Sequence, residues 1–202
     1  MDTDDALVTR LAHDLDGSFE ALVRAHQDRL FSIAYRFLGD RHDAEEVTQD
    51  ALVRVYRALG GYDPDRIAAL RLRPWLATIV LNVCRTRTAR RRIVPNPLSL
   101  DRVDDADGTR LADPVADATT SPSAVVEGRE VRRRWASLVT QLPPAYRAPI
   151  VLRHVDGLSY PELAIALDRP EGTVKAQVHR GLALLRTVFE AAERHEREEI
   201  PA

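Results

Sequence analysis

GLSYPELAIALDRPEGTVKAQVHRGLALLR, residues 157–186, predicts two helices joined by a tight turn. Ser159 and Glu162 have the S-x-x-E spacing of a capping box, so the first helix should begin near Ser159. The segment 168–172 carries proline and glycine and ends that helix, and Thr173 is the expected N-cap of the second. Such a pair can lay its second helix in the major groove of DNA.

The two faces of the second helix differ in chemistry. Its buried face should consist of residues that recur at helical spacing: Val174, Val178, Gly181, Leu182 and Leu185. The residues of the pair expected to contact DNA bases or phosphates are Ser159, Tyr160, Thr173, Lys175, Ala176, Gln177, His179 and Arg180. Gln177 can contact adenine with two hydrogen bonds, although it lies near the edge of the expected buried face.

Length and composition predict an intracellular protein of one or two small domains. The chain has 202 residues, of which 45% are hydrophobic, and a single cysteine, which excludes an internal disulfide framework. The N-terminus is acidic rather than basic, and the most apolar run, residues 76–84, is too short to span a membrane. The six histidines show no metal-ligand spacing. We therefore expect a cytoplasmic protein with no membrane insertion, metal or cofactor.

The net charge of −2 conceals strong segregation along the chain. Residues 1–70 carry −6, residues 71–92 carry seven arginines and no acid, residues 93–128 return to −5, and residues 129–186 carry +5. Two basic blocks suggest two sites that contact phosphate. The alternative is that the arginines only solvate helix faces.

Periodicity and helix-breaking residues predict an all-α fold of two small helical domains. The expected divisions are an N-terminal extension at 1–16, a helical bundle at 17–92, a flexible acidic linker with four prolines at 93–122, a helix-turn-helix domain at 123–190 and an acidic C-terminal tail at 191–202. No stretch has the alternation of a strand. Composition alone makes the linker a simple tether.

Helix signals subdivide the two domains. In the first, one helix over 19–37 should end at Gly39, a second capped by Asp40 should end at residues 60–61, and a third should run from near Pro74 into the arginines. In the second, residues 143–144 should end a helix containing Trp135, and the next should run to about Asp156.

These segments resemble, in order, the bacterial RNA polymerase sigma factors of the extracytoplasmic function (ECF) group. LPPAYRAPIVLRHVDGLSYPELAIALDRPEGTVKAQVHR, residues 142–180, is similar to region 4 of that family, and DAEEVTQDALVRVYRAL, residues 43–59, to region 2.2. RPWLATIVLNVCRTRTARRR, residues 73–92, is similar to regions 2.3 and 2.4. The resemblance covers about residues 17–190, with the linker in place of the middle domain of larger sigma factors.

The resemblance implies a protein that binds core RNA polymerase and directs promoter-specific initiation of transcription without catalysing a reaction. It assigns the residues of region 2.2 to the coiled coil of the largest polymerase subunit: Asp43, Glu45, Glu46, Gln49, Asp50 and Arg54. Taken without the resemblance, this acid-rich face is better explained as a solvated helix surface with local ion pairs. The resemblance also makes an anti-sigma protein a plausible partner, although no residue identifies it.

For the third helix the resemblance implies recognition and melting of the promoter −10 element. Asn82 aligns with the family asparagine near the −10 strand, and residues 62–73 should form the loop that holds a flipped base. Trp75 is expected in the core rather than as a stacking platform. The full set of residues expected to contact the −10 region is Tyr62, Arg71, Arg73, Thr78, Asn82, Arg85, Arg87, Arg90, Arg91 and Arg92.

Region 4 departs from the family pattern in the helix that is expected to contact the −35 element. Many relatives read GTVKSRLHRAR, whereas this chain has Ala176, Gln177, Gly181 and Leu182 and so lacks two arginines. The base preference of better-known members therefore does not transfer.

Three other classes of protein are alternative explanations of the same sequence features. A stand-alone helix-turn-helix regulator would use the opening motif but would not need the arginine block at 71–92, and it would bind duplex DNA tightly without polymerase. A serine recombinase would need an N-terminal mixed sheet, for which no strand pattern exists. A pure interaction protein would not need two arginine-rich surfaces. We expect the free chain to bind promoter DNA poorly, because its acidic segments offset the basic ones.

Overall fold

A computed structural model describes residues 3–93 and 134–198, and all the regular secondary structure in those ranges is helical. The first range folds into α1 (Thr3–His13), α2 (Leu15–Leu38), α3 (Arg41–Gly60), α4 (Pro64–Ala68) and α5 (Leu72–Ile93). The second contains a short helix over 134–140 followed by α7 (Pro144–His154), α8 (Tyr160–Leu167) and α9 (Glu171–Glu198). The all-α prediction is confirmed. The predicted linker at 93–122 lies outside the described residues, apart from its first position.

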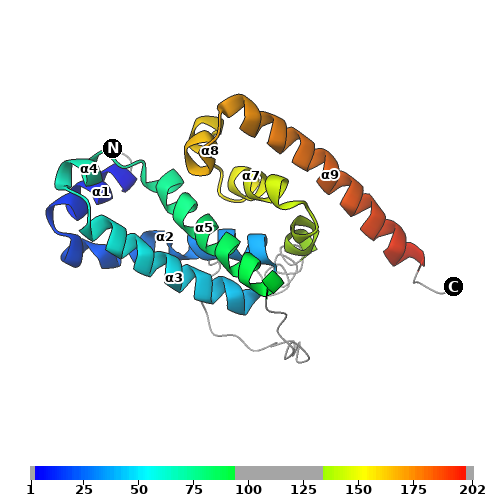
Figure 1. Cartoon of the computed structure of the whole chain (residues 1–202), viewed down its shortest axis with the longest axis horizontal. Helices are drawn as coiled ribbons and strands as arrows, with labels where there is room; N and C mark the ends of the chain where they lie inside the picture. The colour runs from blue at the N-terminus through cyan, green and yellow to red at the C-terminus, as the bar shows by residue number, and fades with distance from the viewer. Residues whose placement is uncertain (1–2, 94–133, 199–202) are drawn as a thin grey trace, which may run out of the picture.

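The helices of the first range form a bundle in which α2, α3 and α5 pack on one another (Figure 1). The predicted end of α2 is confirmed, because Gly39 adopts the left-handed conformation (φ 76°). The predicted start of α3 is also confirmed, because the carboxylate of Asp40 accepts a hydrogen bond from the Asp43 amide at 2.8 Å. Leu30, Val47 and Leu81 are buried in the shared core.

Helix α1 has no counterpart in the sequence prediction. Leu7, Val8 and Leu11 are buried, and the helix packs on α2 and α4. Asp4 lies 3.3 Å from the buried ring of His26 on α2. Residues 3–13 are therefore an integral part of the bundle.

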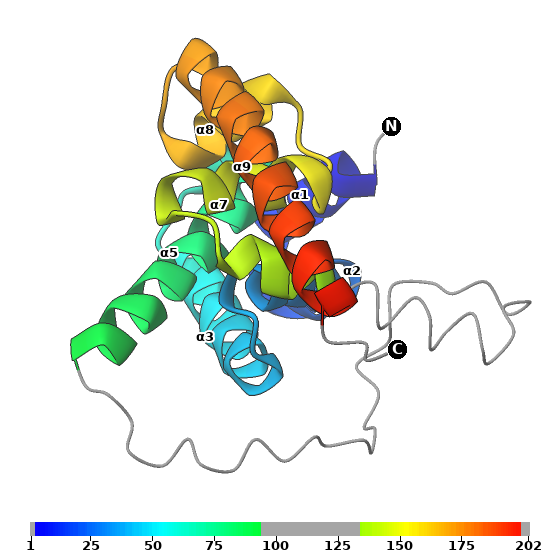
Figure 2. The same ribbon diagram turned by 90° about the vertical axis from the view of Figure 1, so that its right-hand side faces the viewer.

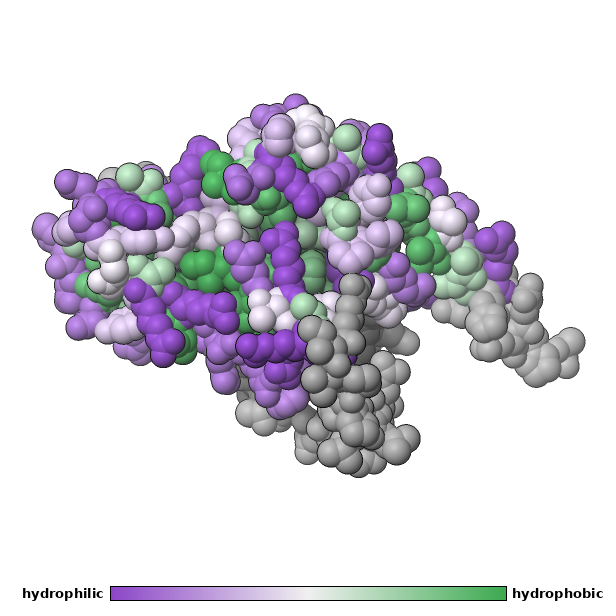
Figure 3. Space-filling model, in the orientation of Figure 1, coloured by the Kyte–Doolittle hydropathy of each residue, from purple (hydrophilic) through white to green (hydrophobic). Residues whose placement is uncertain are grey.

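The helices of the second range form a smaller unit in which α7 and α8 pack on the first half of α9. The far half of α9 extends away from the α1–α5 bundle in Figure 1, and in Figure 2 it points toward the viewer. The two units lie against each other through α5 and α8 and through α2 and α7. In the space-filling view, polar residues dominate the visible face and apolar residues appear mainly in the seams between helices (Figure 3).

Candidate nucleic-acid interface

The capping box predicted at the start of α8 is present. The Glu162 carboxylate accepts hydrogen bonds from the Ser159 hydroxyl at 2.6 Å and the Ser159 amide at 2.8 Å, while the Glu162 amide donates to the Ser159 hydroxyl at 3.4 Å. Burial alone would raise the pKa of Glu162, but the hydrogen bonds from Ser159 and the nearby Arg73 and Arg71 lower it. Ser159 therefore holds the helix start in this structure.

The turn between α8 and α9 differs from the predicted one in where the second helix begins. Asp168 takes the left-handed conformation (φ 51°) that ends α8. The Val174 amide donates to the carbonyl of Pro170 at 3.1 Å, so the first turn of α9 already includes Glu171. The prediction of Thr173 as the N-cap is wrong: Thr173 lies inside the helix and is exposed.

The outward face of α9 carries four of the predicted DNA-contacting residues, all exposed: Lys175, Ala176, His179 and Arg180. The Lys175 ammonium lies 2.7 Å from Glu171 and 5.5 Å from the centre of the Tyr160 ring. The hydrogen bond and charge of Glu171 raise the pKa of Lys175. Leu182, predicted on the buried face, is 39% exposed, so that part of the pattern is wrong.

An open hollow of about 400 Å³ lies between the start of α7 and this face of α9. It is lined by Ala145, Tyr146, Gly172, Thr173, Ala176, Gln177 and Arg180. The amide oxygen of Gln177 is buried and has no hydrogen-bond partner within the described part of the chain. A buried acceptor without a partner is costly, which makes it a candidate to accept a hydrogen bond from a ligand that fills the hollow.

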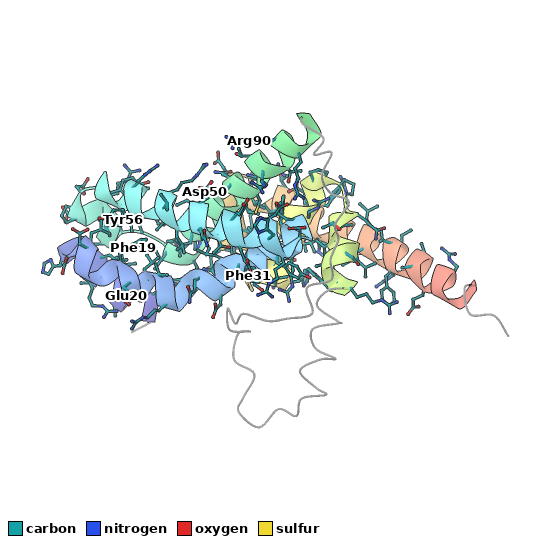
Figure 4. The ribbon with its side chains drawn as sticks, turned by 90° about the horizontal axis from the view of Figure 1, so that it is seen from below. Phe19, Glu20, Phe31, Asp50, Tyr56 and Arg90 are labelled. Atoms are coloured by element: carbon teal, nitrogen blue, oxygen red, sulfur yellow. The ribbon has the colours of Figure 1, made fainter. Side chains whose placement is uncertain are left out.

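On α5 the predicted DNA-contacting residues divide into an outward and an inward set. Asn82 is exposed, and its side-chain oxygen accepts a hydrogen bond from Arg85 at 3.0 Å. Arg90 is also exposed and projects near the far end of α5 (Figure 4). Arg87 and Arg91 instead turn to the carboxylate of Asp43, at 2.8 and 2.5 Å. The side chain of Arg92 lies outside the described residues.

The resemblance places Asp43 on the polymerase-binding surface, but in the structure its carboxylate is buried. Its side chain has no exposed area, and hydrogen bonding to it, followed by its charge, raises the pKa of Arg87. Glu46 also pairs with Arg87. Asp43 therefore joins α3 to α5, since an unpaired carboxylate in the core would be strongly unfavourable.

Two of the remaining residues of that surface, Glu45 and Gln49, line a groove between α2 and α3. The groove, about 160 Å³, is lined by Gln27, Asp28, Phe31, Glu45, Thr48, Gln49 and Leu52. Asp50 and Arg54 are exposed on α3 outside the groove lining, and their charged groups lie 3.9 Å apart (Figure 4 shows Asp50). The α2 side of the groove has no signal in the sequence; it includes Asp28, whose pKa is raised by burial.

The segment 62–73 is ordered by aromatic contacts and by α4. Tyr62 lies 6.1 Å from the ring of Trp75, and the guanidinium of Arg66 stacks over Tyr62 at 3.7 Å. Ile67 is buried and Arg71 exposed. Trp75 packs against the core, which confirms its expected place there.

Thr78 and Arg73 contact the second helical unit. The Thr78 hydroxyl lies 3.1 Å from the carbonyl oxygen of Ala166, and Arg73 donates to the carbonyl of Asp156 at 2.6 Å. Partial burial, followed by the charge of Arg169, lowers the pKa of Arg85. Among the described residues there is no cluster of three metal-binding side chains, and no helix combines the length and hydropathy needed to cross a bilayer.

Comparison with known proteins matches two families to the two units. Sigma-70 region 2 matches residues 22–93, and sigma-70 region 4 matches residues 132–185. The chain is 33% identical over 199 residues to the RNA polymerase sigma-E factor of Streptomyces avermitilis, covering 95% of this chain and all of that protein. It is 33% identical over 172 residues to the ECF sigma factor SigE of Mycolicibacterium smegmatis, covering 84% of this chain but only 60% of that longer protein.

A solved structure shares the arrangement of helices. The structure of CnrH in complex with the cytosolic domain of CnrY superposes with a TM-score of 0.66 at 26% identity, covering 94% of this chain and 99% of that one.

Proposed function

The chain belongs to the sigma-70 family as an ECF sigma factor, and from that premise we propose how its own residues divide the work of promoter-specific initiation. Sigma factors of this family bind core RNA polymerase and promoter DNA. In our proposal the α1–α5 bundle binds the polymerase and opens the −10 element in the cytoplasm, and the α7–α9 unit recognises the −35 element. The polymerase, not this chain, carries out the catalysis.

The −35 proposal rests on the hollow beside α9. Arg180 lines the hollow, and Lys175 and His179 are exposed on the same helix, so all three can bind phosphate or base edges. Gln177 also lines the hollow, and its buried amide oxygen, which has no partner among the described residues, can accept a hydrogen bond once the side chain turns outward. The exocyclic amine of adenine in the major groove is a donor that this oxygen can accept from. We propose that Gln177 reads one adenine while the cations fix the position of the helix.

The −10 proposal assigns the outward face of α5 to the separated strand. Asn82 can both donate to and accept from an unpaired base, and Arg90 remains exposed to bind phosphate. Arg87 and Arg91 contribute less to DNA, because both are held by Asp43.

The polymerase proposal assigns the groove between α2 and α3 to the coiled coil of the largest subunit. The exposed polar residues beside it complement a basic helix, and Phe31 supplies an apolar floor. The structural likeness to CnrH in its complex with CnrY leads us to propose that a protein partner of that kind also binds this chain.

Transcription in vitro with purified core polymerase and a promoter library tests the function. Programmed initiation at a defined promoter set is expected, and Gln177→Ala should relax preference at one −35 position by about tenfold. Arg186→Ala, an exposed change later on α9, is the control and should leave every position unchanged. No initiation at any promoter, or tight specific binding of duplex DNA by the chain alone, would contradict the proposal.

A charge reversal on the groove separates polymerase binding from DNA recognition. Glu45→Arg should weaken binding to core polymerase by about tenfold, because Glu45 lines the groove and a charge at the rim of an interface steers association. Glu20→Arg makes the same change on an exposed part of α2 that does not line the groove, and this variant should bind normally. Equal losses in both variants would refute this face.

A further inference from the structure

An ion pair joins the two units of the chain. The guanidinium of Arg29 on α2 makes two hydrogen bonds to the carboxylate of Asp156 in the α7–α8 turn, one of them at 2.6 Å from Nη2 to Oδ2. The Asp156 side chain is completely buried, and that of Arg29 is 18% exposed. Arg73 on α5 donates to the backbone carbonyl of the same aspartate. A two-point pair between arginine and carboxylate has defined geometry and is little screened.

A second set of contacts lies at the other end of the interface. Arg147 on α7 donates to the carbonyl of Phe37 at 3.2 Å and its guanidinium lies 5.4 Å from the Phe37 ring. Arg36 lies 5.9 Å from the ring of Trp135. The interface is therefore anchored at two places by cations of one unit on acceptors or rings of the other.

The α7–α8 turn and α8 cover two residues of α5, Arg73 and Thr78, that the sequence predicts to contact the −10 region. The Thr78 hydroxyl is hydrogen-bonded to Ala166, and the Arg73 guanidinium is bound to the Asp156 carbonyl. Glu162 lies close enough to Arg73 and Arg71 for their charges to lower its pKa. A DNA strand that used Thr78 and Arg73 would have to displace α8.

Features of the interface also permit it to open. Arg85 and Arg169 bring two positive charges together across it, which opposes closure. The units are separated in sequence by 40 residues, 94–133, so non-covalent contacts rather than a short connection hold them together. Polar interfaces between domains of one chain commonly separate.

From this geometry we propose that the structure is an autoinhibited closed state, in which the Arg29–Asp156 pair locks the −35 unit over the −10 surface until core polymerase separates the two. The expected effect on transcription initiation rests on the proposed function, but the Arg29–Asp156 lock itself is a property of the free chain. Removing Arg29 penalises only the closed state, because Asp156 regains water when the units part.

The distance between the units in the free chain tests the lock. Spin labels at Glu20→Cys on α2 and Arg186→Cys on α9 occupy exposed sites. Burial raises the pKa of Cys84 to about 12, so the native thiol stays unlabelled at neutral pH. Double electron–electron resonance should give one narrow distance, and Arg29→Ala should raise the open-to-closed ratio at least about tenfold.

Matched variants make the result specific to the lock. Arg24→Ala removes an exposed arginine from the same helix and should leave the narrow distance unchanged. Arg29→Lys keeps the charge but loses the two-point geometry, so it should open the chain to an intermediate degree even if the alanine variant fails to fold. A distance that Arg29→Ala and Arg29→Lys both leave unchanged, or a broad distribution in the unsubstituted chain, overturns the proposal.

Addition of core polymerase separates this inference from the proposed function. The narrow distance should become longer in the complex, and Arg29→Ala should need several-fold less polymerase for half-maximal initiation. Persistence of the short distance in an active complex refutes the lock. A chain that is closed when free but never programs polymerase would instead refute the proposed function.

Discussion

Gly181 lies where α9 packs closely against α7, and its replacement by alanine tests how tightly the recognition helix is held. A Cβ at this position would lie 2.8 Å from Cγ1 of Ile150 and 3.4 Å from Cβ of Tyr146. Alanine would gain about 1 kcal/mol in helix propensity over glycine. Forcing a methyl group into a packed contact costs about 1–3 kcal/mol, so the net effect should be a loss of about 1 kcal/mol.

Gly172 supplies the matched control on the same helix. A Cβ there meets no atom within 4 Å, so Gly172→Ala should stabilise the chain by about 0.4–1 kcal/mol. For a protein of this size 1 kcal/mol corresponds to about 2–4 °C in Tm. Thermal unfolding followed by circular dichroism should therefore move in opposite directions for the two variants.

The functional readout of the same pair is −35 binding in the polymerase complex. A methyl group at residue 181 pushes α9 away from Ile150 and shifts the hollow that contains Gln177, so Gly181→Ala should weaken −35 recognition several-fold. If Gly181→Ala raises Tm as Gly172→Ala does, Ile150 yields readily and close packing is not what requires glycine there.

Three further substitutions test the interior of the fold. Ser159→Ala should lower the unfolding free energy by about 1 kcal/mol through loss of the capping box and raise the pKa of Glu162, which carbon-detected NMR titration would follow; an unchanged pKa would show that Ser159 does not set it. Asp43→Asn should cost about 1–3 kcal/mol in denaturant unfolding, whereas Asp50→Asn, exposed on the same helix, should cost less than about 0.5, and equal costs would contradict the buried role of Asp43. Burial lowers the pKa of His26 below 6.5 in the folded chain, so the unfolded chain binds more protons near that pH. The free energy of unfolding should therefore fall as the pH drops through about 6.5. His26→Gln should flatten that fall, whereas His42→Gln, an exposed change, should not.

Local signals predicted the helix ends where a single side chain or glycine sets them. Gly39, Asp40 and Ser159 act as their sequence positions indicate, because caps depend on contacts three or four residues away. The start of α9 was misplaced because Pro170 is itself compatible with a first helical turn, and the turn closes before Thr173.

The buried role of Asp43 had a signal in the sequence that charge alone obscured. Asp43, Val47, Ala51 and Val55 are spaced four residues apart, which places the aspartate in line with the buried stripe of α3. Its partners, Arg87 and Arg91, lie more than 40 residues away, so their pairing depends on how α3 and α5 pack. Helix α1 carried a similar signal in Leu7, Val8 and Leu11.

The interface between the units depends on contacts that the sequence does not reveal. Arg29 and Asp156 are separated by 127 positions, and nothing in the local pattern of either residue marks it as a partner of the other. Each would be interpreted as an ordinary surface charge, Arg29 in the middle of α2 and Asp156 just after α7. Their pairing follows from the way α7 rests on α2.

The basic block at 71–92 is therefore less available to DNA in the closed chain than its seven arginines suggest. Asp43 pairs with Arg87 and Arg91 at the surface of the bundle, and the α7–α8 turn binds Arg73. Separation of the units releases Arg73 but leaves the Asp43 pairs intact, because all three residues of those pairs belong to the bundle. The charge that becomes available to DNA when the chain opens is thus concentrated at the start of α5, where Thr78 is uncovered at the same time. Weak DNA binding by the free chain would then arise from arginines that already have internal partners, and not only from the acidic segments elsewhere in the sequence.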